Sequence, residues 1–400
     1  MLARRGSLRW LLRRYEAVRP QQIISNRSCR LQPIYVTKPY LPPLSEFVRL
    51  LEQVWETRIL TNNGPFHQQL ETRLQDVFDS PNVSLTTNGM LALTTALNAA
   101  KLEGEVITTP YSFVATTHAL SLEGLTPVFV DIRPSDLNID PDQIEAAITE
   151  RTSAIVAVHV YGNPCAVTQI EAIASRHGLK VIYDAAHAFG VRYQGRSLLS
   201  HGDFSALSFH ATKAFNTFEG GAVVSRALEG KRAVDSARNF GIADEVNIPV
   251  VGTNAKMSEI NAAFGLVQLD HFGDVLRRRG QVDALYRRLL GNIEGIDLVE
   301  TPEGVEPNYS YFPIMVRESH PLSRDALYEA LKAVGIFSRR YFYPLLSSLP
   351  MYAGLPSAAP ERLPNAQQAA NQVLCLPIYP DLLESDQYRI AETIIDLSRR

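Results

Sequence analysis

The stretch VTQIEAIASRHGLKVIYD, residues 167–184, decides the fold class. Its first part, Val167–His177, has the apolar spacing of an amphipathic helix. Its last part, Lys180–Asp184, is a short, mostly apolar run that is typical of a buried strand. A helix that leads into a buried strand is the repeating unit of an α/β protein.

The same alternation extends over about residues 84–225. We predict strands at Glu105–Thr109, Pro127–Asp131, Ala154–Val160, Lys180–Asp184, Phe204–Ser208 and Ala222–Ser225. Helices are predicted between them at Leu91–Lys101, Pro141–Thr149 and Val167–His177. Because the strands are apolar almost throughout, we expect helices on both faces of a mostly parallel sheet. Ligands bind outside the carboxyl ends of such strands, which makes Asp184 and Ser208 candidate site residues.

The composition of the 400 residues is that of a globular protein, with 46% apolar and 20% charged residues. It excludes disordered, collagen-like and coiled-coil proteins, and the net charge of −3 gives no reason to expect a nucleic-acid partner. Three scattered cysteines, Cys29, Cys165 and Cys375, argue against a disulfide framework and a structural zinc site, so no metal is expected. No apolar run is long enough for a membrane span. We therefore expect a soluble, cytoplasmic protein.

The first 30 residues differ from the rest, since they carry eight arginines against the single Glu16. A basic leader is compatible with an organelle transit peptide, with a nucleic-acid arm or with translation from an early start. We favour a poorly ordered leader, because sequence with the pattern of a folded protein begins near Ile34.

Three parts are expected: a leader over residues 1–33, an N-terminal arm with a large domain over 34–285, and a small C-terminal domain over 286–400. Asn254–Leu269 has one apolar face and predicts a helix, which Asp270–Leu290 continues. Beyond about Gly291 the pattern changes to a strand at Tyr309–Val316 and shorter helices at Arg324–Val334 and Ser385–Ser398.

A lysine lies in the turn after one of the predicted strands, in SFHATK (residues 208–213), with EGG at 219–221. In an apolar turn, burial lowers the pKa of an amine toward neutrality, and a neutral amine can form a Schiff base. The alternative for an isolated lysine such as Lys213 is a salt-bridged or snorkelling side chain.

An acid ends the neighbouring strand, in DAAHAFG (residues 184–190). A buried carboxylate is costly without a positive partner, and a protonated pyridine nitrogen would supply one. Alone, Asp184 is equally compatible with a helix N-cap. Together with Lys213 it indicates a pyridoxal 5'-phosphate (PLP) site, because PLP needs an imine-forming lysine and an acid that keeps its ring nitrogen protonated.

The phosphate of PLP also needs a binding site. Residues 86–90, TTNGM, precede the predicted helix at Leu91–Lys101, and amides at a helix N-terminus bind phosphate. Most Asn-Gly pairs are turns, however, and this pattern alone is weak. Phe113 is a candidate for stacking on an aromatic ring, with the hydrophobic core as the alternative.

Several motifs together carry a family resemblance: TNGM at 87–90, NPCAVTQIEAIA at 163–174, DAAHAFG at 184–190, SFHATK with EGG, and NAKMSEINAAFGLVQL at 254–269. In their order and spacing they resemble the DegT/DnrJ/EryC1/StrS family of PLP-dependent sugar aminotransferases, over roughly residues 34–395. The resemblance implies the type I (aspartate-aminotransferase-like) fold, PLP as cofactor and a homodimer with active sites at the subunit interface.

The resemblance assigns three catalytic residues. Lys213 would bind PLP covalently and move the proton between coenzyme and substrate. Asp184 would pair with the pyridinium nitrogen. His187, where many relatives have Gln, would contact the phenolic oxygen of the ring. Relatives that dehydrate sugars have His at the lysine position, so Lys213 favours amino transfer.

It also assigns the remaining cofactor contacts. Ser208 and the amides of Gly89 and Met90 would hold the phosphate, Phe113 would stack on the ring, and Asn254 would reach the phosphate from the partner subunit. The sequence departs from the family pattern at Met90, where Thr is common, and in Ala255-Lys256, which replace Tyr-Arg.

Within the family, residues 36–43, 60–65 and 338–344 resemble the enzymes that make dTDP-4-amino-4,6-dideoxyglucose (viosamine). The resemblance implies glutamate as amino donor and dTDP-4-keto-6-deoxyglucose as acceptor. Arg339 and Arg340 are candidates for the pyrophosphate of the nucleotide, with surface or structural arginines as the alternative. The alternative functions are a 3-aminotransferase for a related keto sugar and a non-catalytic regulatory protein with this fold.

Overall fold

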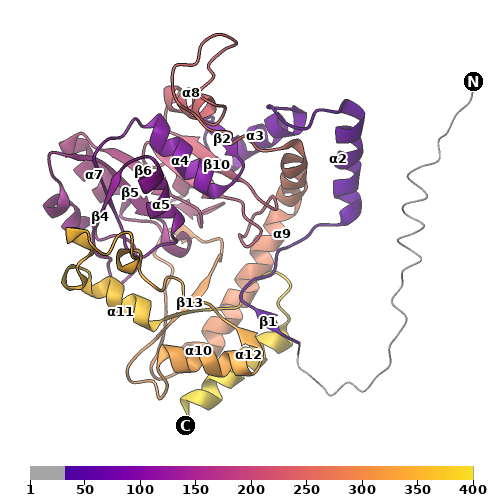
Figure 1. The fold of residues 1–400 in the computed structure, drawn as a ribbon. Helices are drawn as coiled ribbons and strands as arrows, with labels where there is room; N and C mark the ends of the chain where they lie inside the picture. Colours follow the sequence, from indigo (N-terminus) through magenta and orange to yellow (C-terminus); the bar gives the residue numbers. More distant parts are fainter. Residues whose placement is uncertain (1–31, 400) are drawn as a thin grey trace, which may run out of the picture. The chain divides into compact units, whose positions relative to one another are not determined.

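The computed structural model describes residues 32–399, and the chain forms one compact unit from Ile34 onward (Figure 1). At its centre is a seven-stranded sheet with the strand order β2-β10-β9-β6-β5-β3-β4. Its strands are β2 (Val83–Thr86), β3 (Glu105–Thr108), β4 (Thr126–Phe129), β5 (Thr152–Val158), β6 (Lys180–Asp184), β9 (Phe204–Ser208) and β10 (Gly221–Ser225). Neighbours pair in parallel except at β10, which is antiparallel to both β2 and β9. The predicted α/β fold with a mostly parallel sheet is confirmed.

Helices cover both faces of this sheet. One face packs against α4 (Gly89–Ala99), α5 (Ala115–Leu122) and α8 (Leu228–Ala237), and the other against α3 (Pro65–Phe78), α7 (Val167–His177) and the first part of α9 (Glu259–Leu290). Consecutive strand residues alternate between the two cores: Ile182 faces α4, whereas Val181 and Tyr183 face the other side. This alternation explains why the strands are apolar throughout.

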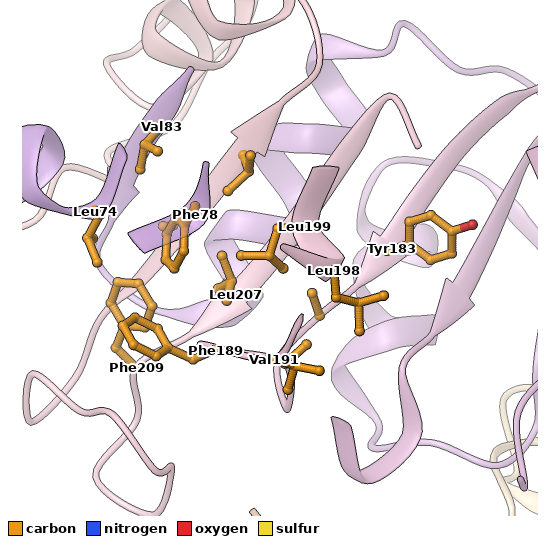
Figure 2. Packing of buried hydrophobic residues seen from close by; sticks show 14 of the residues in the cluster. Leu74, Phe78, Val83, Tyr183, Phe189, Val191, Leu198, Leu199, Leu207 and Phe209 are labelled. Carbon is orange, nitrogen blue, oxygen red and sulfur yellow. The ribbon is translucent and has the colours of Figure 1, made fainter. Parts of the chain in front are cut away.

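Two labelled rings, Phe189 from the loop after β6 and Phe209 from the loop after β9, lie side by side in the core (Figure 2). Phe189 stacks on Phe215 with ring centroids 4.1 Å apart, and Phe209 meets both rings edge-on. Each buried ring stabilises the fold by about 1.5–3 kcal/mol. These contacts fix the loops that carry the candidate residues Asp184 and Lys213.

A second core lies around the carboxyl-terminal part of α9. It includes β11 (Ile296–Leu298), β13 (Phe312–Val316), β15 (Val373–Leu376), α10 (Arg324–Ala333) and α12 (Glu384–Ser398). The first described strand, β1 (Ile34–Tyr35), joins it by pairing in parallel with β14 (Ile336–Phe337). The domain boundary at residue 285 stays a prediction, since α9 runs through it.

The remaining elements are short or peripheral: α2 (Leu44–Thr57), α6 (Pro141–Ile144), α11 (Pro364–Gln372), β7 (Arg192–Tyr193), β8 (Arg196–Ser197) and β12 (Val305–Glu306). The α-helix predicted over Pro141–Thr149 is shorter in the structure. It ends at Ile144, and a 3-10 helix over Glu145–Ala147 follows it.

The helix predicted from Asn254 begins only at Glu259. Ser258 is extended and caps it, since its hydroxyl accepts a hydrogen bond from the Asn261 amide at 3.4 Å. Residue Asn254 forms an isolated β-bridge with Asn239 instead. The helix then continues unbroken to Leu290, over 32 residues.

The predictions for the basic leader fall on residues 1–31, which lie outside the described part of the chain. Among the helices of residues 32–399, none combines the length and the apolar character needed to cross a membrane. A cytoplasmic location stays a prediction.

Candidate active site

A cavity of about 510 Å³ lies at the carboxyl ends of β6 and β9. Seven of the ten predicted site residues line it: Gly89, Met90, Phe113, Asp184, His187, Ser208 and Lys213. Four separate segments of the chain bring them together. Tyr311, Tyr341 and Phe342 add to the wall, and they pack in a third hydrophobic cluster that includes Tyr111 and Tyr161.

Asp184 ends β6 inside this cavity and is buried. One carboxylate oxygen accepts a hydrogen bond from the Thr116 hydroxyl at 2.8 Å, and the other accepts one from the Ala186 amide at 3.2 Å. Burial raises the pKa of Asp184, and these hydrogen bonds and the charge of Lys213 offset only part of the effect. No helix follows Asp184, so the N-cap interpretation is wrong. A positively charged group bound beside this carboxylate would therefore stabilise its ionised form.

Lys213 lies in the loop after β9. Its amide donates to the carbonyl of His210 at 2.9 Å, and the buried rings of Phe209 and Phe215 hold the loop on either side. Burial lowers the pKa of the amine to about 8, against the opposing charge of Asp184. Within residues 32–399 no carboxylate lies within 4 Å of this amine. The salt-bridged alternative therefore does not apply.

His187 lies in the cavity wall as a neutral ring. Its Nδ1 accepts a hydrogen bond from the Tyr161 amide at 3.3 Å, so we assign the ring proton to Nε2. Burial, together with the nearby charge of Lys213, lowers the pKa of His187 well below its ordinary value. The ring lies parallel to Phe342 with centroids 5.8 Å apart. A neutral ring of this kind can donate one hydrogen bond from Nε2.

The N-terminus of α4 meets the end of β9 at the same cavity. Asn88 caps the helix, because its side chain accepts from the Leu91 amide at 2.9 Å. A Cβ atom on Gly89 would lie 2.6 Å from Cβ of Ser208, so only glycine lets the two segments approach. The first amides of α4 and the Ser208 hydroxyl thus form a site with the chemistry of an anion cradle.

The other three predicted residues do not line this cavity. Asn254 is exposed and accepts a hydrogen bond from Nζ of Lys256 at 2.9 Å. Arg339 is exposed, and Arg340 pairs with Asp325 at 2.7 Å. Their assigned roles stay predictions.

Sequence reasoning missed four residues of the site: Thr116, Tyr311, Tyr341 and Phe342. Thr116 is fully buried in α5, and Tyr341 and Phe342 lie in the stretch 338–344, which the sequence singles out by family resemblance alone. Tyr311 lies 98 residues from Lys213 along the chain, directly before β13, and nothing in the sequence pattern around it connects the two.

Comparison with known proteins identifies the family. Residues 44–395 match the model of the DegT/DnrJ/EryC1/StrS aminotransferase family. The chain belongs to this family. It is therefore an aminotransferase.

Members of the DegT/DnrJ/EryC1/StrS family with high similarity include two curated proteins named dTDP-4-amino-4,6-dideoxy-D-glucose transaminase. The one from Shigella dysenteriae is 52% identical over 92% of this chain and 99% of its own length. The one from Escherichia coli is 50% identical over 90% of this chain and 98% of its own length. Among solved structures, DesI, crystallised with its TDP-sugar product, has a TM-score of 0.89 and 38% identity, with 92% of this chain and 94% of that chain covered.

Proposed function

We propose that the protein is a PLP-dependent aminotransferase that transfers the amino group of glutamate to dTDP-4-keto-6-deoxyglucose and so makes dTDP-4-amino-4,6-dideoxyglucose. The observation that carries the proposal is the cavity that unites Lys213 with Asp184. The names of the two relatives that are 50% and 52% identical support the choice of substrate.

The residues of the cavity fit PLP. The buried Asp184 carboxylate matches a pyridinium nitrogen, and the cradle of Gly89, Met90 and Ser208 matches a phosphate. When bound, PLP would supply the electron sink that lets an amino group leave one carbon and enter another. Phe113, which is 58% exposed at the cavity wall, offers an aromatic face for its ring.

Each polar residue then has a separate task. Lys213, with a pKa of about 8, holds and releases a proton near neutral pH, which suits a general acid–base group. Asp184 orients the ring and neutralises its charge. His187 donates from Nε2 and, being neutral, adds no further positive charge beside Lys213.

The sugar nucleotide would enter past Tyr341 and Phe342. Arg339 is exposed and lies two residues before Tyr341 of the cavity wall, so we propose it for the pyrophosphate. Arg340 is a weaker choice, because it is already paired with Asp325 and lies over the ring of Tyr328, 4.6 Å from its centroid.

We also propose a homodimer in which Asn254 serves the partner subunit's cavity. Large apolar side chains stay exposed in this chain, among them Trp55 at 67% and Val251 at 87%, which supports association with a second copy.

The test is the purified protein with PLP, glutamate and a panel of keto-sugar nucleotides. We expect visible absorbance from bound PLP that fades with glutamate, and a product whose new amine NMR locates on C4. Lys213→Ala should abolish both, whereas the matched variant Lys180→Ala, which loses only a surface pair with Asp203 at 3.2 Å, should retain them. A wild-type protein that binds no PLP would refute the proposal, and an amine on C3 would favour the 3-aminotransferase.

A further inference from the structure

The segment Asn308–Tyr311, which leads into β13, brings a hydroxyl group against the amine of Lys213. Nζ of Lys213 donates a hydrogen bond to the Tyr311 hydroxyl at 3.4 Å and lies 5.9 Å from the centroid of the Tyr311 ring. Both side chains line the same cavity. Tyr311 thus reaches the candidate reacting nitrogen from the segment that leads into β13.

The ring of Tyr311 is held in place by its neighbours. It meets His187 at an interplanar angle of 66° with centroids 4.8 Å apart, and Tyr341 at 87° with centroids 5.7 Å apart. Edge-on packing against two rings restricts rotation of the side chain. The direction of the hydroxyl is therefore set by packing, whether or not Lys213 is bound to it.

The backbone before Tyr311 is held by a buried arginine. Arg279, which is 2% exposed, donates from Nε to the carbonyl of Tyr309 and from Nη2 to the carbonyl of Ser310, both at 2.9 Å. Within residues 32–399 no carboxylate lies within 4 Å of this guanidinium. A buried cation without a counter-ion is costly, so the two carbonyls explain its position.

Two further features fix the same segment. Nδ2 of Asn308 donates to the carbonyls of His187 and Phe189 at 2.8 and 2.9 Å, which ties it to the loop after β6. Tyr309 has a φ of 52°, a left-handed conformation that a bulky residue keeps only where its surroundings enforce it.

Building on the aminotransferase function proposed above, we infer that Tyr311 belongs to the catalytic machinery: its hydroxyl binds the Lys213 amine and directs the nitrogen lone pair into the cavity. Arg279 and Asn308 are positioning residues that act through Tyr311. An amine held in one orientation reacts with a smaller loss of entropy than a freely rotating one.

The test compares Tyr311→Phe, which removes only the hydroxyl, with the matched control Tyr352→Phe. Tyr352 is a buried tyrosine whose hydroxyl bonds Oγ of Ser121 at 3.1 Å, away from the cavity. Two quantities are measured on the full-length chain. One is kcat and KM for glutamate with PLP bound. The other is the pH midpoint at which Lys213, in protein freed of PLP, is acetylated by acetic anhydride, followed by peptide mass spectrometry.

For Tyr311→Phe we expect kcat to fall about five- to tenfold, the effect of one lost hydrogen bond, with KM nearly unchanged. The acetylation midpoint should move below the wild-type value of about 8, because the phenol oxygen binds the protonated amine more strongly than the neutral one. The other titratable groups of the cavity remain in both proteins: Asp184, His187, His210, Glu219 and Tyr341. A loosened fold would instead move the midpoint up toward 10.5, the ordinary lysine value.

The inference is overturned unless both quantities change in Tyr311→Phe and neither changes in Tyr352→Phe. A loss of kcat with an unmoved midpoint would mark a packing role only. If the wild type transfers no amino group to any keto sugar but the midpoint still falls in Tyr311→Phe, the proposed function fails and the contact with Lys213 stands. If the wild type is active and the variant matches it, the function stands and this inference fails.

Discussion

Asp184 combines a high folding cost with a proposed essential role. Its carboxylate is buried, and burial raises its pKa because no positive charge of the fold fully compensates it. Asp184 thus lowers the stability of the fold for the benefit of a bound group, which is a trade-off between stability and activity.

The variant Asp184→Asn separates the two effects. We expect kcat to fall at least about a hundredfold, since the amide cannot neutralise the coenzyme ring. Without PLP, the melting temperature of the variant should equal or exceed that of the wild type, because the amide needs no counter-charge. Steady-state kinetics and thermal unfolding by circular dichroism measure the two quantities. A variant that is active, or one that melts well below the wild type, would contradict this account of Asp184.

At the scale of the element, the start of α4 depends on close contact with β9. Gly89→Ala would place a methyl group 2.6 Å from Cβ of Ser208 and 3.1 Å from its Cα, which forces the helix away from the strand. We expect the dissociation constant for PLP to rise about tenfold or more, which is about 1.4 kcal/mol. Equilibrium dialysis with PLP measures the change.

Gly273→Ala is the matched control for this substitution. Gly273 lies within α9, and a Cβ atom there would meet nothing within 4 Å. We expect the same chemical change to stabilise the protein by about 0.5–1 kcal/mol, through helix propensity alone, and to leave PLP affinity unaltered. Equal losses of affinity in the two variants would mean that the cradle is not where we locate it.

Elements are also the scale at which the sequence was most informative. The bounds of α7, β6 and β9 agree with the predicted ones, because an apolar run between polar residues is a local signal. The start of α9 was predicted five residues early, since Met257 extends the apolar pattern although Ser258 caps the helix. The antiparallel direction of β10 had no local signal at all.

The residues of the candidate site also fall into those with a local sequence signal and those without one. Asp184 and Ser208 were predictable because each ends a strand, and Lys213 because it lies in the loop five residues after the end of β9. Thr116 and Tyr311 were not, since their contacts depend on how distant segments pack. Long-range packing leaves little trace in a single sequence, whereas strand ends and motifs do.

At the scale of the whole molecule, the proposed dimer is testable through Asn254, which is exposed and absent from the cavity of its own chain. Lys213→Ala and Asn254→Ala chains are each expected to form impaired homodimers. After mixing and subunit exchange, one site of each hybrid would combine an intact Lys213 with an intact Asn254 from the other chain.

We therefore expect the hybrid to recover up to about half of the wild-type activity per active dimer, because only one of its two sites is complete. Activity assays on hybrids isolated with two different affinity tags measure the recovery. If Asn254 serves its own chain's cavity, neither site of the hybrid is complete and the mixture stays as weak as the Asn254→Ala homodimer.

The helix α9 contributes to two cores at once, with Phe264 and Leu266 packed beneath the central sheet and Tyr286 and Leu290 packed beside β13. Because one continuous helix packs in both cores, unfolding of either core would disrupt the helix that the other needs. We therefore expect heat to unfold both cores together. A calorimeter should accordingly record a single endotherm for the purified chain, and two resolved peaks would show that this shared helix does not couple them. Such coupling would also make Tyr311, which directly precedes Phe312 of the second core, and Lys213, whose loop is held by Phe209 of the first, gain and lose their relative positions in one step.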